Sequence, residues 1–364
     1  MSADMMDFLR KVPKLAAKRS KDILQVNPTI HDIRPDNQNV RIKVYDYNAE
    51  GIHDYTFGDV HQCFQFKNNG YTSWINVDGI RKAEIEQLSQ EFGIHQLLVE
   101  DILSSGQRPK MDEVEGILFC QLNMLYYNDE FNQIESEQVS IVLGRDFVIS
   151  IQEDDRGDVF DGLRNKLQFA QSKVRQRNAD YLLYSMLDVI VDNYFLAMEK
   201  IAIQIENLEE QVSKSSDERC LAYFNHLRKE LIVLRRNIIP VRDLITGIIR
   251  SESELLEERN TKYFKDINDH ITQAFDLTEN YRDMLVGIQE LYINNVNLKL
   301  NEIMKFIAIV TCLMAPATVI GGIFGMNFDV IPYTHHKFGF YAAVGLMLII
   351  PLFMLFGFKK RGWF

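Results

Sequence analysis

Hydrophobic positions are unevenly distributed along this chain of 364 residues, and its long uninterrupted apolar runs all lie after residue 303. One run covers residues 306–324 and the other covers residues 338–358, and neither contains a charged residue. About 20 such residues are needed to cross a hydrocarbon core roughly 30 Å thick. Core helices of a soluble protein are the alternative, but such helices are uncommon at this length without a single charge. The pattern therefore predicts two C-terminal transmembrane helices.

Upstream of the first run, the hydrophobic pattern has a helical period from about residue 260 and shows no convincing stop before residue 325. The apolar or near-apolar residues that recur at coiled-coil-like steps are Ile267, Ile271, Ala274, Tyr281, Leu285, Ile288 and Tyr292. A helix of roughly 60 residues would be about 90 Å long, which is too long for one globular domain. We therefore predict that residues 260–325 form a stalk helix that continues into the first transmembrane helix.

The pattern before residue 158 is a mixture of strands and helices. Alternation of Val40, Ile42 and Val44 with charged residues indicates a half-buried strand. Further predicted strands are 71–77, 116–127 and two that flank a turn at Gly144, and the predicted helices are 81–92 and 95–103. Residues 38–157 are therefore expected to form an α+β domain with a small sheet and helices beside it.

The remaining segments complete the predicted domain organisation. Residues 158–250 have a helical pattern with one polar break at residues 213–219, which predicts an antiparallel helical hairpin within residues 158–259. Residues 1–37 are rich in charge and are expected to be a flexible arm. The other expected segments are an external loop at 326–337, the second transmembrane helix at 338–358 and a basic tail at 359–364.

Basic residues predict how the two spans are oriented. Lys299 and Lys305 precede the first span, and a basic cluster that begins at Lys359 follows the second. The loop between the spans carries only Lys337. Because positive charge is retained on the cytoplasmic side, both termini are expected in the cytoplasm of a multi-pass protein of the cell (inner) membrane.

Charge and motif content exclude several classes of function. The net charge is −11, which argues against nucleic acid as a partner because phosphate binding needs a basic surface. The four cysteines form no CxxC pair, and this argues against zinc knuckles and redox motifs. We find no nucleophile–base constellation and no phosphate-binding GxxxxGK motif, so neither an enzyme nor an ATP-driven pump is expected.

A stripe of polar and small residues follows one side of the predicted stalk and first span. Its members are Asn294, Asn297, Asn301, Met304, Ala308, Thr311, Ala315, Thr318 and Gly322. The stripe is compatible with the lining of a narrow axial tube in a symmetric ring of helices, and equally with a small-residue packing seam. Asn327, just beyond its end, favours the pore, because a ring of uncharged amide carbonyls can bind the water shell of Mg²⁺.

Gly325-Met326-Asn327 lies at the outer end of the first of two C-terminal spans, and in that position it resembles the signature of the CorA family of magnesium transport proteins. Segments 99–113, 263–285 and 301–316 and the basic tail also resemble this family, so the similarity extends from about residue 40 to the end. The resemblance implies a funnel-shaped homopentamer in which the first membrane helix lines the pore.

The resemblance also implies roles for individual residues. Asn327 would be the filter amide of the selectivity filter, with Gly325 and Met326 shaping its turn. Met304 and Ile307 would form an apolar constriction. The pore lining above this constriction is implied to contain Thr311, Ala315, Thr318 and Gly322. The polar funnel below it is implied to contain Asn301 and Glu290. Asp101 and Asp266 would bind regulatory Mg²⁺ between neighbouring subunits.

Three hypotheses of function follow from the sequence. The first is a divalent cation channel for Mg²⁺ uptake, with Co²⁺ or Ni²⁺ as side substrates, driven by the membrane potential and closed by cytoplasmic Mg²⁺. The second is the related zinc-transporting branch, whose signature usually has another residue in place of Met326. The third is a non-conducting, membrane-anchored coiled-coil scaffold, which leaves Asn327 unexplained.

The chain also departs from the family pattern in places. Phe324 stands where the family often has tyrosine, and Asp329 is the only acid of the external loop. His335 and His336 are either ligands for a transition metal or solvated loop residues.

Overall fold

The computed structural model describes residues 40–153, 158–214, 217–326, 331–332 and 336–362. It divides into two compact units, Met1–Ile288 and Gln289–Phe364, and the helix α7 belongs to both. The predicted N-terminal arm lies outside the described residues. Each unit is treated separately below.

A mixed sheet of seven strands forms the centre of the first unit. Its order is β2-β1-β3-β7-β6-β5-β4, and β3 and β7 form the parallel pair while the other neighbours are antiparallel. The strands are β1 (Arg41–Tyr47), β2 (Ile52–Phe57), β3 (Thr72–Asp78), β4 (Lys110–Val114), β5 (Ile117–Asn128), β6 (Gln133–Leu143) and β7 (Phe147–Gln152). The middle strands are buried on both faces, as expected for a sheet covered by helices on each side.

The two edge strands are the part of the sheet that the hydrophobic pattern did not predict. Strand β2 is largely exposed, and β4 is only half-buried, so neither has the apolar alternation that marks a covered strand. The predicted turn at Gly144 is present between β6 and β7. A Cβ atom at Gly144 would lie 2.3 Å from the ring of Phe147, so only glycine fits there.

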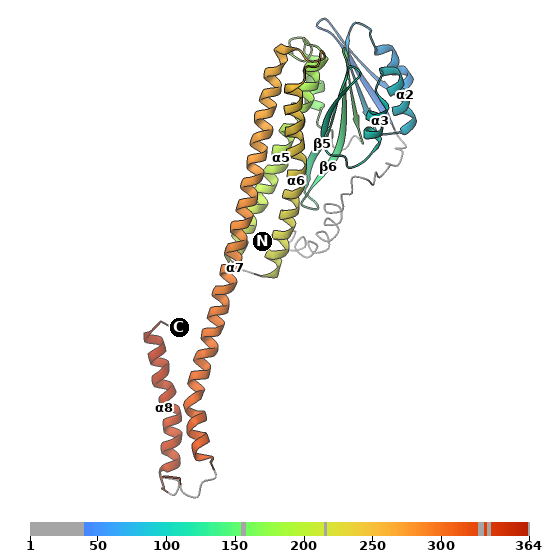
Figure 1. Ribbon diagram of the computed structural model, residues 1–364. Helices are drawn as coiled ribbons and strands as arrows, with labels where there is room; N and C mark the ends of the chain where they lie inside the picture. The colour runs from blue at the N-terminus through green and yellow to red at the C-terminus, as the bar shows by residue number, and fades with distance from the viewer. Residues whose placement is uncertain (1–39, 154–157, 215–216, 327–330, 333–335, 363–364) are drawn as a thin grey trace. The chain divides into compact units, whose positions relative to one another are not determined.

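Helices cover both faces of the sheet (Figure 1). On one face lie the 3-10 helix η1 (Val60–Phe66) and the helices α2 (Lys82–Phe92) and α3 (Gln96–Leu103), which share a hydrophobic core with the sheet. On the other face lie α4 (Asp161–Gln168), α5 (Ala179–Lys214) and α6 (Glu218–Arg250). The result is a three-layer α/β/α arrangement.

The hairpin of α5 and α6 is present, but the prediction of a single break between residues 158 and 250 is wrong. Residues 169–178, between α4 and α5, are not helical. The buried side chain of Arg175 explains this, because its guanidinium donates hydrogen bonds to the carbonyls of Asn48 and Gln168 at 3.2 and 3.4 Å. These bonds hold the segment in turns beside β1 instead of a helix.

Helix α7 (Thr261–Phe324) is continuous over 64 residues and passes through Pro316 without a break. A short 3-10 helix, η2 (Glu258–Asn260), precedes it. Within the first unit, its apolar residues pack against the other helices, so Ile267, Ile271 and Ala274 are fully buried. The coiled-coil-like spacing is therefore satisfied by helices of the same chain in this part of α7.

The second unit contains the rest of α7 and helix α8 (Gly339–Lys360). Both helices are long and apolar enough to cross a membrane. Large side chains such as Phe306 and Phe353 are 67% and 75% exposed. Exposure of this extent over many apolar residues suits contact with lipid or with further copies of the chain, not with water.

Candidate functional site

The stripe on α7 lies on the side of the helix that faces away from α8. Within the first apolar run and the turn before it, most of the partly or fully buried residues of α7 recur at steps of three and four: Lys305, Ile309, Leu313, Pro316 and Ile320, with Ala317 beside them. At 100° per residue, the stripe from Met304 to Gly322 is centred on the opposite side of the helix. Its members are all exposed in the single chain.

The stripe changes in chemical character along the helix. Met304 and Ile307 are apolar and are 67% and 57% exposed. One turn further on, Thr311 donates its hydroxyl proton to the carbonyl of Ile307 at 2.8 Å, and Thr318 donates to that of Met314 at 3.0 Å. Each hydroxyl oxygen keeps lone pairs that can accept a hydrogen bond from water. Such a face can offer an apolar constriction followed by a weakly polar lining.

The end of α7 leaves little room for a side chain at Gly325. The N–H of Gly325 donates to the carbonyl of Gly321 at 2.9 Å, and a Cβ atom at Gly325 would lie 3.1 Å from that same oxygen. The N–H of Met326 donates to the carbonyl of Ile323 at 3.3 Å. The helix therefore ends in a tight turn just before Asn327. Asn327, Asp329 and His335 lie outside the described residues, so the filter role of Asn327 stays a prediction.

The polar residues predicted for the lower funnel lie on the surface of α7. Asn301 and Glu290 are both exposed in the single chain. Neither has a ligand-like neighbour in the second unit that the structure describes. Their predicted role therefore depends on other copies of the chain.

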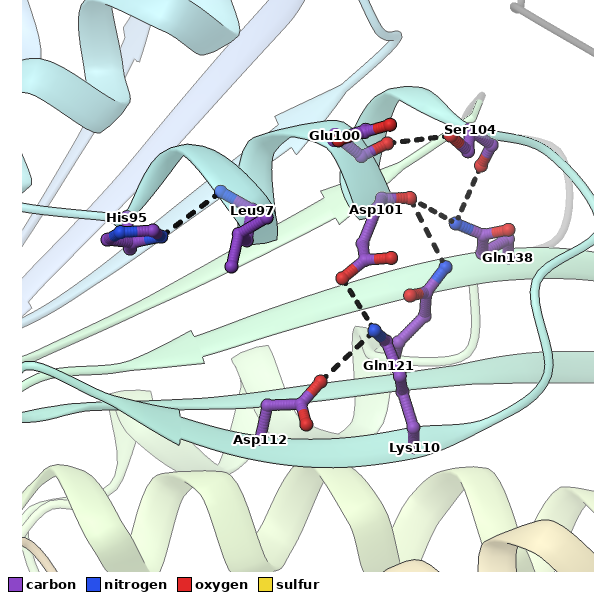
Figure 2. A network of polar contacts seen from close by, with 9 residues as sticks. All are labelled: His95, Leu97, Glu100, Asp101, Ser104, Lys110, Asp112, Gln121 and Gln138. Carbon is purple, nitrogen blue, oxygen red and sulfur yellow. Dashed lines mark hydrogen bonds and ion pairs between the residues drawn. The ribbon is translucent and has the colours of Figure 1, made fainter. Parts of the chain in front are cut away.

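Asp101 lies in the last turn of α3 and forms an ion pair within its own chain (Figure 2). The ammonium of Lys110 on β4 lies 2.6 Å from Oδ2 of Asp101 and 3.1 Å from Oδ2 of Asp112. Burial lowers the pKa of Lys110, but the hydrogen bonds to the two carboxylates outweigh it and the pKa is raised above its ordinary value. The Asp101 carboxylate is thus already neutralised by a cation in the single chain.

The main chain at Asp101 is held by the sheet below it. The amide of Gln121 on β5 donates to the carbonyl of Asp101 at 3.4 Å, and that of Gln138 on β6 donates to the carbonyl of Ser104 at 3.2 Å. The Ser104 hydroxyl donates to the carbonyl of Glu100 at 2.7 Å. The last carbonyls of a helix need partners of this kind, and here they fix the position of Asp101 (Figure 2).

Asp266 is exposed near the start of α7, and among the described residues it is not a partner of Asp101. It lies instead near a group that the sequence analysis missed: Asp188 and Asp192 on α5 and His270 on α7. One ligand atom of each of these three side chains lies within 4.8 Å of the others. His270 Nδ1 is 3.4 Å from the Asp192 carboxylate. Burial raises the pKa of Asp188, and the carboxylates of Asp192 and Asp266 raise it further.

Each half of this group has a weak signal in the sequence. Asp188 and Asp192 are four residues apart, as are Asp266 and His270, so each pair lies on one helix face. The signal that was missing is the packing of α5 against the start of α7. The two helices contact each other there, since the ring centroids of Tyr184 on α5 and Phe264 on α7 are 6.0 Å apart.

The group suits a divalent cation. Carboxylate oxygens are the protein ligands that Mg²⁺ prefers, and Mg²⁺ usually keeps several waters beside one or two of them. The imidazole of His270 extends the fit to Co²⁺ or Ni²⁺. The mutual repulsion that raises the pKa of Asp188 is what a bound dication would relieve.

Known proteins resemble this chain over most of its length. The model of the family described as "CorA-like Mg2+ transporter protein" matches residues 69–360. A protein of Thermotoga maritima, named "Cobalt/magnesium transport protein CorA", is 36% identical over 327 residues, which cover 90% of this chain and 93% of that protein.

Two solved structures share the fold. The CorA magnesium transporter from Methanocaldococcus jannaschii superimposes with a TM-score of 0.74 at 22% identity, over 89% of this chain and 98% of that one. The cytoplasmic domain of ZntB from Vibrio parahaemolyticus gives a TM-score of 0.54 at 15% identity, over 71% and 99%. At these identities the likeness concerns the fold alone.

Proposed function

Because this chain belongs to the CorA-like Mg²⁺ transporter family, we propose that it is a channel that carries Mg²⁺ into the cell. The protein is a membrane protein with two candidate transmembrane helices, α7 and α8. The observation that carries the proposal is the stripe on α7, which is centred on the side away from α8 and is exposed in the single chain. Both termini are proposed to lie in the cytoplasm. The basic residues gather at the ends of the spans away from the connecting loop, and positive charge is retained on the cytoplasmic side.

The pore forms only when several copies assemble, and a homopentamer is proposed. In a closed ring the stripes of neighbouring α7 helices face a common axis. Met304 and Ile307 would then form the narrow apolar part, and Thr311, Ala315, Thr318 and Gly322 the lining above it. Asn327 of each copy would surround the outer mouth and bind the hydrated ion through its amide carbonyl.

The membrane potential supplies the driving force for uptake. Each unit charge that crosses 100 mV gains about 2.3 kcal/mol, so a dication gains roughly 4.6 kcal/mol on entering a negative cell. No further energy source is required. Co²⁺ and Ni²⁺ are proposed as side substrates.

Cytoplasmic Mg²⁺ is proposed to close the channel by binding between subunits. Asp266 of one copy and Asp101 of the next would share an ion, and Asp188, Asp192 and His270 extend the acidic surface around Asp266. Empty carboxylates brought together repel one another, and a dication between them converts that repulsion into a link. Loss of the ion would release the subunits and open the pore.

The test of conduction is Mg²⁺ flux into proteoliposomes under a negative internal potential. We expect Asn327→Ala to reduce flux at least tenfold, because a lost charge-assisted contact costs about 1.5–3 kcal/mol. Asn225→Ala, at an exposed asparagine on α6, serves as the matched control and should conduct normally. Unchanged flux in Asn327→Ala would remove Asn327 from the filter.

The zinc-transporting alternative is separated by competition in the same assay. The fold resemblance to the ZntB domain does not decide the ion, whereas Met326 of the Gly-Met-Asn signature favours Mg²⁺. Zn²⁺ that blocks or replaces Mg²⁺ at equal concentration would favour the alternative.

A further inference from the structure

We propose that the Lys110 ammonium pairs with the Asp101 carboxylate when Mg²⁺ is absent and competes with Mg²⁺ for it. This competition sets the Mg²⁺ concentration at which the cytoplasmic domain binds the regulatory ion. The inference rests on the proposed function, because it takes Asp101 as a ligand of the regulatory ion. It adds a residue that competes with that ion and is itself no ligand.

The ammonium of Lys110 pairs with one of the two carboxylate oxygens that Asp101 can offer to a metal ion. It lies 2.6 Å from Asp101 Oδ2, which is well within the range of a charge-assisted hydrogen bond. The Asp101 side chain is only 17% exposed, so few directions remain from which a second cation can reach its oxygens. Binding of Mg²⁺ at Asp101 and pairing with Lys110 are therefore in competition.

Asp101 and Lys110 differ in how freely their side chains can move. Asp101 is fixed because the carbonyls around it accept hydrogen bonds from Gln121 and Gln138 on the sheet. Lys110 is 37% exposed and carries its charge on four flexible carbons. When an ion arrives, it is the ammonium that moves.

Asp112 gives the displaced ammonium a second partner. Its Oδ2 lies 3.1 Å from the Lys110 nitrogen, and the Asp112 side chain is 41% exposed. A lysine released from Asp101 therefore keeps an ion pair with Asp112 and is not left as an unpaired charge. The Asp101–Lys110–Asp112 triad (Figure 2) can thus exchange one cation for another at small cost.

The triad makes two substitutions act in opposite directions. Lys110→Met removes the competitor and leaves Asp101 fully negative, so Mg²⁺ should bind at lower concentration. Asp112→Asn removes the alternative partner and ties the ammonium to Asp101, so Mg²⁺ should bind only at higher concentration. A lysine with a purely structural role would lower the unfolding temperature in both variants without these opposite shifts.

The experiment is limited proteolysis of the purified full-length protein during a titration with Mg²⁺. The Mg²⁺ concentration that gives half of the full protection (the midpoint) should fall about three- to tenfold in Lys110→Met and rise by a similar factor in Asp112→Asn. A change of this size is expected when one partly exposed ion pair is lost or strengthened. Lys82→Met, which removes a lysine paired with Glu86 on α2, is the matched control and should not move the midpoint.

A further variant separates failure of this inference from failure of the proposed function. Asp266→Lys should abolish Mg²⁺ protection if the proposed intersubunit ion exists. If it does so while the Lys110→Met midpoint stays unchanged or rises, the role of Lys110 is refuted and the regulatory ion stands. If Asp266→Lys keeps full protection, the proposed regulatory ion is refuted and the inference about Lys110 falls with it.

Discussion

Asp188 shows at the scale of a single residue how the packing of α5 against α7 brings like charges together. Its carboxyl group is half-buried, and the carboxylates of Asp192 and Asp266 act on it from two helices. Burial and like charge both raise its pKa, so the charged form of Asp188 is unfavourable in the folded protein without a cation. His270 opposes this effect only in part.

Asp188→Asn is therefore expected to stabilise the protein without Mg²⁺. Like charges at this spacing cost about 0.2–0.5 kcal/mol, which corresponds to a rise in unfolding temperature of about 1–2 °C. The further rise on adding Mg²⁺ should become smaller than in the native protein. A thermal shift assay with and without Mg²⁺ measures both effects.

The control for Asp188→Asn is Asp269→Asn, which removes an exposed carboxylate from the neighbouring position on α7. It should leave the Mg²⁺-dependent rise unchanged. An equal Mg²⁺ response in Asp188→Asn and the native protein would contradict a cation at Asp188, Asp192 and His270.

Helix α7 illustrates at the scale of an element how one helix can meet two environments. Its side near α8 includes Ile309, which is buried, and Gly321, where an added Cβ atom would lie 3.7 Å from the Met347 side chain. The stripe that contains Thr311 and Thr318 lies on the opposite side. Val310 is also exposed, at 44%, but it belongs to neither face.

The side of α7 near α8, the stripe and the exposed position Val310 between them predict a pattern of cysteine labelling. After Cys312→Ala removes the native exposed thiol, Thr311→Cys, Thr318→Cys and Gly322→Cys should react with a charged, water-soluble thiol reagent. Val310→Cys should not react, because a lipid-facing thiol is neither hydrated nor easily ionised. Mass spectrometry of the labelled protein measures the result.

Reaction at Val310→Cys without reaction at the stripe would mean that the stripe is a packing seam and not a pore lining. That outcome would favour the scaffold hypothesis over the channel.

At the scale of the whole molecule, a single chain leaves too much apolar surface uncovered outside the predicted span. Leu298, Leu300 and Ile303 precede or adjoin the first apolar run and are 56%, 51% and 49% exposed. Surfaces of this kind mark contacts with other chains. Assembly around the stripe would cover them and would complete the pore.

Native mass spectrometry is expected to show five copies of the chain, both with and without Mg²⁺. Mg²⁺ should change the protection of the assembly and not its subunit count, because the apolar contacts of α7 do not depend on the ion. A monomer that conducts no cations would contradict the channel.

Edge strands and turns show where local pattern ceases to predict the fold. The buried strands β1, β3, β5, β6 and β7 were predicted, since burial imposes apolar residues on them. Strand β2 was not predicted, because an exposed edge needs no such residues. The break at residues 169–178 was missed because it depends on Arg175 reaching the carbonyl of Asn48, which is distant in sequence.

The sequence by itself determined the two apolar spans, the length of α7, the stripe on its surface and the Gly-Met-Asn signature. These features repeat over neighbouring residues, so helical geometry and the thickness of a bilayer are enough to infer them. Only the tertiary structure decided that Lys110 neutralises Asp101 and that Asp188, Asp192 and His270 meet. Those groupings join side chains from different elements, and charges become partners only when packing brings those elements together.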